Sequence, residues 1–250
     1  MGLFRSGNPA LKRLEQVAAN QREGAATVPM TLQGTINKTI ILLLLMLFSG
    51  SITWKLITVS NALGFTLMIG GAIGGFILAL VGIFAPKTIH IIAPLYALFE
   101  GLFIGAISAI YGMLFAGIVL QAVLLTIAIF ISILLLYKFK ILKASAAFVK
   151  GIVIATGGVA LYYIVVIVAS YFFGKDFSVF AMGWVGIVIQ LVIVGIAALN
   201  LVLDFNLIET GVENGYPKKM EWYGAFSLMI TLIWLYIEIL RLLAILNRRN

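Results

Sequence analysis

Seven long apolar runs constrain the fold of this chain more than any other feature of its sequence. A transmembrane helix needs about 20 mainly apolar residues. Runs of that length lie at roughly 37–59, 62–84, 91–111, 115–137, 150–173, 179–203 and 223–246. Their length and their mix of aliphatic, aromatic and Gly residues favour helices over barrel strands, which are about 10 residues long and alternate in polarity. We therefore predict an all-α integral membrane protein built as a bundle of seven transmembrane helices.

The amino-terminal stretch is predicted to be a separate segment. Residues 1–36 are polar and basic, without the apolar run of a cleavable signal peptide. We expect a mostly disordered cytosolic tail at 1–36, followed by a seven-helix transmembrane domain at 37–250. A short surface helix after Pro9 is the alternative for part of the tail.

The distribution of Lys and Arg predicts the topology. If the spans alternate, the side of the amino terminus holds Arg5, Lys12, Arg13, Arg22, Lys38, Lys87, Lys138, Lys140, Lys143, Lys150, Lys218 and Lys219. The other side holds Lys55, Lys175, Arg241, Arg248 and Arg249. The positive-inside rule then places the amino terminus in the cytosol and the carboxyl terminus outside. The positive-inside rule therefore accounts for the net charge of +8, and the basic residues would lie near an anionic inner leaflet. No nucleic-acid partner is expected. In a bacterium, the chain would be a multi-pass protein of the inner (cytoplasmic) membrane.

Small residues four positions apart predict close helix packing in two of the runs. Such pairs let helix backbones approach each other in a membrane. The pairs are Gly70 with Gly74, Gly71 with Gly75, and Gly101 with Gly105. We expect them to pack inside the bundle, and a seam between two copies of the chain is the alternative.

The usual catalytic patterns are absent from the sequence. Cysteine is absent, and the single histidine, His90, lies at the edge of a span, so HExxH zinc chemistry and thiolate sites are excluded and a Ser–His dyad is disfavoured. The chain has no phosphate-binding loop, and its two aspartates, Asp176 and Asp204, do not form the pair that an aspartyl protease needs. We predict that the chain is not an enzyme and holds no cofactor beyond a transient Ca²⁺.

Glu100 lies near the middle of the third run and has no basic neighbour on its own helix. A carboxylate at the centre of a bilayer costs about 2.5–3.5 kcal/mol on insertion scales, so such residues are rare unless they serve a function. Burial without a cation favours the neutral form of a carboxyl group, so we expect Glu100 to titrate near physiological pH. The alternative is a protonated acid whose hydrogen bond joins two helices.

The last run carries one polar stripe. Its members follow one another at intervals of four, three, four and three residues: Ser227, Thr231, Trp234, Glu238 and Arg241. Such a stripe should face the bundle interior or a water-filled cavity. Glu238 and Arg241 would then line a path for ions, or else simply neutralise each other near the outer interface.

Asp204 ends the sixth run, one helical turn after Asn200, so the two side chains can point the same way. Carboxylate oxygens are the ligands that a hard cation such as Ca²⁺ prefers, so a site at Asp204 is one interpretation. An ordinary acid at the end of a helix is the other. Glu209, Glu213 and Glu221 follow in the sequence.

Four sequence motifs resemble the Bax inhibitor-1 family of membrane proteins, in its bacterial branch. They are Arg5-Ser6-Gly7-Asn8-Pro9-Ala10, Gly34-Thr35-Ile36-Asn37-Lys38-Thr39, Leu203-Asp204-Phe205-Asn206-Leu207-Ile208-Glu209 with Gly211-Val212-Glu213-Asn214-Gly215, and Met220-Glu221-Trp222-Tyr223-Gly224-Ala225-Phe226. The resemblance covers nearly the whole chain. It implies a seven-helix bundle, a pH-sensitive calcium leak and a part in stress protection.

The resemblance also implies a latch between an aspartate near the end of span six and one in span seven. Asp204 matches the first aspartate, whereas the second falls near Thr231, which carries no charge. The chain therefore departs from the family pattern at the second position of this latch. Glu209, Glu213 and Glu221 would form an inner acidic cluster near Asp204, or else are solvated loop acids.

These observations lead to one expected function and two alternatives. The expected function is a leak for cations, with Ca²⁺ as the expected ion, that responds to H⁺. Asp204 would be the inner gate acid, Glu100 a titrating site in mid-membrane, and Thr231 and Glu238 would line the path. Arg241 would supply the counter-charge. The first alternative is a non-conducting regulator that binds a membrane protease or another membrane protein. The second is a secondary transporter, for which the sequence offers no pair of broken helices.

Overall fold

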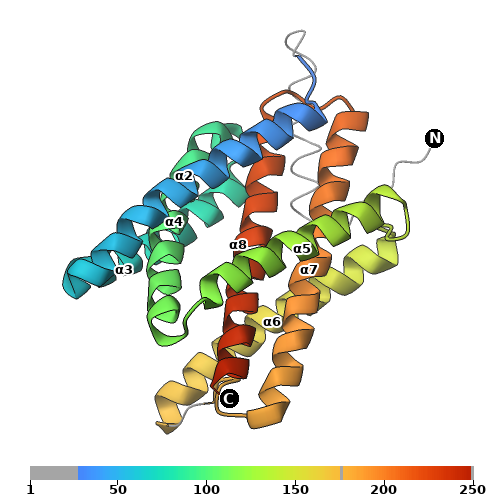
Figure 1. Cartoon of the computed structure of the whole chain (residues 1–250). Coiled ribbons are helices and arrows are strands. Elements are labelled where there is room, and N and C mark those ends of the chain that lie inside the picture. Colours follow the sequence, from blue (N-terminus) through green and yellow to red (C-terminus); the bar gives the residue numbers. More distant parts are fainter. Residues whose placement is uncertain (1–27, 175–176, 249–250) are drawn as a thin grey trace. The chain divides into compact units, whose positions relative to one another are not determined.

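The computed structural model describes residues 28–174 and 177–248. They form seven long helices (Figure 1): α2 (Leu32–Val59), α3 (Asn61–Phe84), α4 (Ile89–Leu114), α5 (Ile118–Lys138), α6 (Ala146–Phe173), α7 (Gly183–Glu213) and α8 (Met220–Asn247). A short 3₁₀ helix, η1 (Pro86–Thr88), precedes α4. All seven are long and apolar enough to cross a membrane, which confirms the predicted all-α, seven-span fold. The tail at 1–27 and the charged residues Lys175, Asp176 and Arg249 lie outside the described residues.

Two helices extend by five or more residues beyond one end of their predicted spans. Helix α2 begins at Leu32, before residue 37, because the Thr31 hydroxyl accepts a hydrogen bond from Gly34 N (2.9 Å) and caps the helix. Helix α7 continues past residue 203 to Glu213, and Gly215, with a φ of 61°, provides the left-handed turn that follows it. The expectation that Asp204 ends its helix is therefore wrong, since it lies about 14 Å before the end of α7 at 1.5 Å per residue.

The chain divides into two compact units. The first unit comprises residues up to Ile110 together with Asn206–Met229, and therefore contains α2, α3, most of α4, the end of α7 and the start of α8. The second unit comprises Tyr111–Phe205 and the residues from Ile230 onward, and contains the last turn of α4, α5, α6 and the remaining parts of α7 and α8. Helices α4, α7 and α8 thus contribute to both units.

Glycines bring α2, α3 and α4 together in the first unit, where these helices lie side by side (Figure 1). A Cβ atom at Gly105 would meet the backbone of Gly50, and one at Gly101 would meet Met46. A Cβ atom at Gly71 would lie 2.7 Å from the carbonyl oxygen of Phe99. The glycine pairs therefore pack within the bundle as predicted, except that a Cβ at Gly70 would meet nothing within 4 Å.

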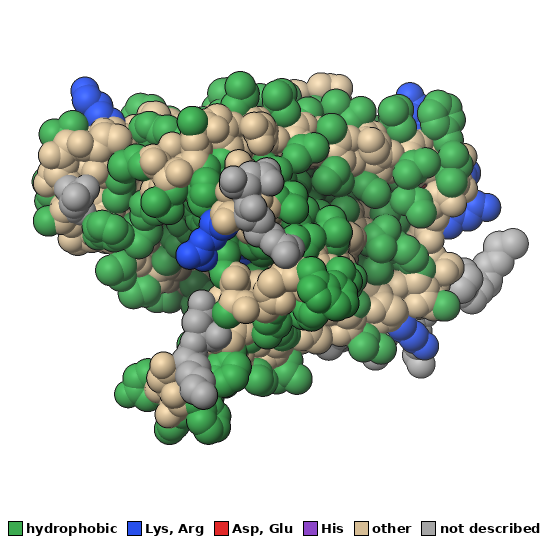
Figure 2. All heavy atoms as spheres, turned by 60° about the horizontal axis from the view of Figure 1, so that its bottom comes forward, with side chains coloured by type: hydrophobic (Ala, Val, Ile, Leu, Met, Phe, Trp, Pro, Cys, Tyr) green, Lys and Arg blue, Asp and Glu red, His purple; other side chains and the backbone are tan. Residues whose placement is uncertain are grey.

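The outer surfaces of the helices are apolar. Hydrophobic side chains dominate the face shown in Figure 2, where Lys and Arg occur at scattered points. Large apolar residues such as Phe172 and Ile154 are exposed, as expected where lipid tails cover a helix. Helix α8 has the most buried span of the seven, and α6 has the least buried one.

Candidate functional site

The polar stripe of α8 meets polar side chains of α6 and α7 in the second unit. Glu238 is 2% exposed, and its carboxylate accepts hydrogen bonds from the Tyr163 hydroxyl (2.8 Å) and from Gln190 Nε2 (2.7 Å). Trp234 Nε1 donates a third hydrogen bond (3.0 Å). Arg241, one turn along α8, forms an ion pair with the same carboxylate (3.0 Å) and also donates to the Tyr163 hydroxyl. We call these five residues the Glu238 network.

The Glu238 network leaves its carboxylate little capacity for another ligand. A carboxylate offers about two lone-pair positions on each oxygen. Three donors contact Oε2 of Glu238, and one contacts Oε1. The guanidinium of Arg241 also lies 4.9 Å from the centre of the Tyr163 ring, close enough for a cation–π contact. In this conformation Glu238 is therefore a locked side chain and is not open to a passing cation.

The sequence suggested only part of this network. Glu238 and Arg241 do lie together, as both interpretations of the stripe required, and Trp234 joins them. Tyr163 and Gln190 were missed because they come from other helices. The available signal was Gln190 itself, an amide in the middle of an apolar run, where a polar side chain is expected to face protein. It is fully buried, and its Nε2 also donates to the Glu238 carbonyl oxygen (2.9 Å).

Asp204 and Thr231 are both buried in the second unit. Asp204 is 5% exposed on α7 and takes part in a hydrogen-bonding or electrostatic interaction inside the protein. Asn200, one turn earlier, donates to the Thr156 hydroxyl of α6 (2.8 Å), so this side of α7 faces protein. The ring of Phe205, next to Asp204, packs against aromatic rings of α5. Asp204 is thus an acid enclosed within an apolar span.

Glu100 lies in the first unit, on α4 against α3. Its Oε1 would be 2.7 Å from a Cβ atom at Gly75, so the absence of a side chain there makes room for the carboxyl group. Tyr96, one turn earlier on α4, is hydrogen-bonded to Glu100. Glu100 is half-buried, and this hydrogen bond supplies the partner that a carboxyl group needs in an apolar span.

The three acids of the proposed inner cluster differ in their surroundings. Glu209 and Glu213 are exposed on α7, whereas Glu221 on α8 is fully buried and forms an ion pair with Lys38 of α2. Within residues 28–174 and 177–248, no three His, Asp or Glu side chains come together in a way that could hold a metal ion. A transient Ca²⁺ at Asp204 alone stays a prediction.

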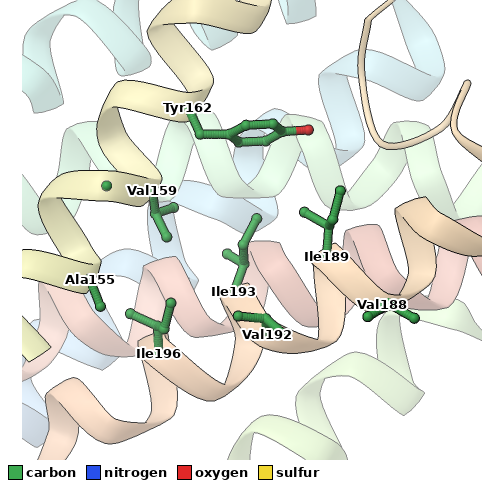
Figure 3. A pocket seen from close by; sticks show the side chains of 9 residues that line it. Ala155, Val159, Tyr162, Val188, Ile189, Val192, Ile193 and Ile196 are labelled. Carbon is green, nitrogen blue, oxygen red and sulfur yellow. The ribbon is translucent and has the colours of Figure 1, made fainter.

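A groove of about 320 Å³ lies between α6 and α7 in the second unit (Figure 3). Figure 3 shows Ala155 and Val159 of α6 on one side and Ile193 and Ile196 of α7 on the other. Tyr162 supplies the one hydroxyl group in the lining. Such a lining offers almost nothing to replace the hydration shell of a cation, so we do not place an ion path in this groove.

Comparison with known proteins identifies a family for this chain. A family model described as Bax inhibitor 1 like matches residues 8–248. No curated protein and no solved structure matches the chain.

Proposed function

Because the chain belongs to the Bax inhibitor 1 like family, we propose that it is a pH-sensitive cation leak, with Ca²⁺ as the cation. The burial of Asp204, an acid within an apolar span, is the observation that carries the proposal. An ionisable side chain at such a place marks an ion or proton pathway more often than it serves packing. We further propose a multi-pass protein of the cytoplasmic membrane with its amino terminus in the cytosol.

In this proposal two acids of the second unit have different roles. Protonation of Asp204 weakens the interaction that it makes inside the protein and shifts a closed–open equilibrium. Glu238 holds the closed conformation, because its carboxylate is occupied by donors from α6, α7 and α8. Opening then requires these donors to release Glu238, and Thr231 would line the path. Glu100 is assigned to a second titrating position, in the first unit.

Ca²⁺ flux into liposomes, measured from pH 6 to pH 8, tests the proposal. We expect the flux of the unaltered protein to rise as the pH falls, because protonation opens the path. Asp204→Asn imitates the protonated acid, so its flux should be high at both ends of the range. Glu213→Gln, a matched control that removes an exposed acid from the same helix, should keep the original pH profile. Flux no greater than that of protein-free liposomes at every pH would exclude the leak.

A non-conducting regulator of a membrane protease or another membrane protein is the second candidate. The occupied carboxylate of Glu238 and the apolar lining of the α6–α7 groove favour it, because neither offers a passage in the observed conformation. Deletion of residues 1–27 separates the two functions, since a leak should persist and a regulator that acts through its tail should lose its effect. The deletion should stop before Val28, because Val28 and Met30 are hydrogen-bonded to the α7–α8 connection.

A further inference from the structure

Residues 28–31, which we call the strap, lie across the connection between α7 and α8 in the first unit. Met30 N donates to Tyr216 O (2.7 Å), and Lys218 N donates to Val28 O (2.9 Å). Pro29 and Pro217 face each other between these two bonds as an antiparallel bridge. Since proline has no N–H group, neither residue can donate a backbone hydrogen bond that would extend the contact. The backbone part of the strap is therefore short.

One apolar side chain anchors the strap. Met30 is buried, and it lines a small cavity together with residues from the end of α7 and the start of α8: Leu207, Ile208, Tyr216, Met220, Tyr223 and Gly224. A Cβ atom at Gly211 would be 2.6 Å from the Met30 sulfur, so this glycine leaves room for it. The flexible thioether fills an irregular gap of this kind well.

A buried carboxylate provides the remaining contacts. Glu221 Oε1 accepts hydrogen bonds from Thr31 N (3.0 Å) and from the Thr31 hydroxyl (3.1 Å). Glu221 Oε2 forms an ion pair with Lys38, whose ammonium group also lies 5.4 Å from the centre of the Trp222 ring. The carboxylate occupies the space where Gly34 would carry a side chain. We call Glu221, Thr31 and Lys38 the Glu221 clamp.

The position of the Glu221 clamp explains how a charge can be buried there. The carboxylate lies at the amino-terminal end of α2, where free N–H groups and the helix dipole favour an anion. A buried ion pair is nevertheless a weak source of net stability, because both charges lose their water, while removal of one partner is strongly destabilising. An ion pair of this kind fixes one arrangement and can be released as a unit.

We propose that the Glu221 clamp is a releasable latch that restrains the α7–α8 hairpin, and that its release increases the leak. The restraint of the hairpin is independent of the proposed function, and only the increase of the leak depends on it. The hairpin is the pair of helices that carries Asp204, Thr231 and Glu238, and the strap ties their connection to the start of α2. Movement of the hairpin away from α2 must break the clamp, two backbone hydrogen bonds and the Met30 contact.

Thiol labelling tests the latch without any measurement of flux. The chain contains no cysteine, so Met30→Cys introduces a single buried thiol. Its reaction with a membrane-impermeant maleimide should be about tenfold faster, or more, when combined with Glu221→Gln, because the strap opens more often. Lys38→Met should have the same effect, since it removes the other half of the ion pair. Glu213→Gln, which removes an exposed acid near the same connection, should leave the rate unchanged. Equal rates in all four backgrounds would overturn the latch.

A reversible cross-link tests the link with the leak. Residues that face each other in a non-hydrogen-bonded antiparallel pair have Cα atoms about 4.5 Å apart, within the range that a disulfide spans. Pro29→Cys combined with Pro217→Cys should therefore lock the strap when oxidised. We expect Ca²⁺ flux at pH 6 to fall at least fivefold on oxidation and to recover with a reductant. Equal flux in both redox states would overturn the link. If no sample shows flux, the leak itself fails, and the labelling rates alone decide whether the clamp is a latch.

Discussion

Tyr163→Phe is a sharp test of the Glu238 network, because it removes one oxygen atom and keeps the ring. The lost hydroxyl donates to Glu238 at 2.8 Å and accepts from Arg241. A hydrogen bond to a charged group contributes about 1.5–3 kcal/mol in soluble proteins, whereas measured values inside membranes average about 0.6 and reach about 1.7 kcal/mol. The ring can still hold its cation–π contact with Arg241. We therefore expect a loss of about 1–2 kcal/mol.

Two measurements check this value. Proteins of 150–250 residues lose roughly 2–4 °C in Tm for each kcal/mol, so the Tm of the purified variant should fall by about 2–8 °C. If the network holds the closed conformation, the leak should also increase, by about tenfold for each 1.4 kcal/mol. Tyr171→Phe is the matched control, since Tyr171 lies on the same helix and is 84% exposed. Equal Tm values for the two variants would refute the stabilising role of the network, and a lower Tm without added flux would refute its role in closure.

Two further substitutions test packing and backbone geometry. Gly71→Ala should lower stability by about 1–3 kcal/mol, because its Cβ would lie 2.7 Å from Phe99 O. Gly70→Ala, at a position open to 4 Å, should be neutral or stabilising in the same thermal unfolding assay. Equal losses would contradict the packing argument. Lys140→Gly should raise stability by about 0.5–1 kcal/mol, because Lys140 has a φ of 57°. Lys143→Gly should bring no gain, and a gain of the same size there would remove the conformational explanation.

The spans were predictable because their cause is local. A helix that crosses a bilayer must be apolar over about 20 residues, and that requirement is visible in any window of the sequence. The same criterion placed the end of the sixth span at residue 203, ten residues before the end of α7, because it detects apolar residues and does not detect helix formation. The polar residues Asn206 and Glu209 interrupt the apolar run after residue 203, yet they lie within α7.

The polar contacts between helices were not predictable in the same way. Lys38 and Glu221 are 183 residues apart, and Tyr163 and Glu238 are 75 residues apart. The spacing along one helix identifies which residues share a face, but it does not identify the helix that this face meets. Lys38 was therefore counted only as a topological charge, and Glu221 only as one of three neighbouring acids. The close packing of helices at glycine was predictable, because small residues four positions apart are typical of helices that pack closely in membranes.

The length of α7 limits how this helix can move in a bilayer. Trp184, which is 69% exposed, lies at its first turn, and the exposed acids Glu209 and Glu213 lie at its last turns. The distance from Trp184 to Glu209 along the helix is about 38 Å at 1.5 Å per residue, compared with a hydrocarbon layer of about 30 Å. If Trp184 lies at one edge of this layer, Glu209 lies about 8 Å beyond the other edge. Only a shift of more than about 8 Å along the membrane normal toward the Trp184 side would draw the Glu209 carboxylate into lipid, at about 2.5–3.5 kcal/mol, whereas a shift the other way would at once pull the indole ring from the interface that it prefers. Long piston-like movements of α7 are therefore disfavoured, and an opening that involves Asp204 should proceed by rotation or tilt of the helix.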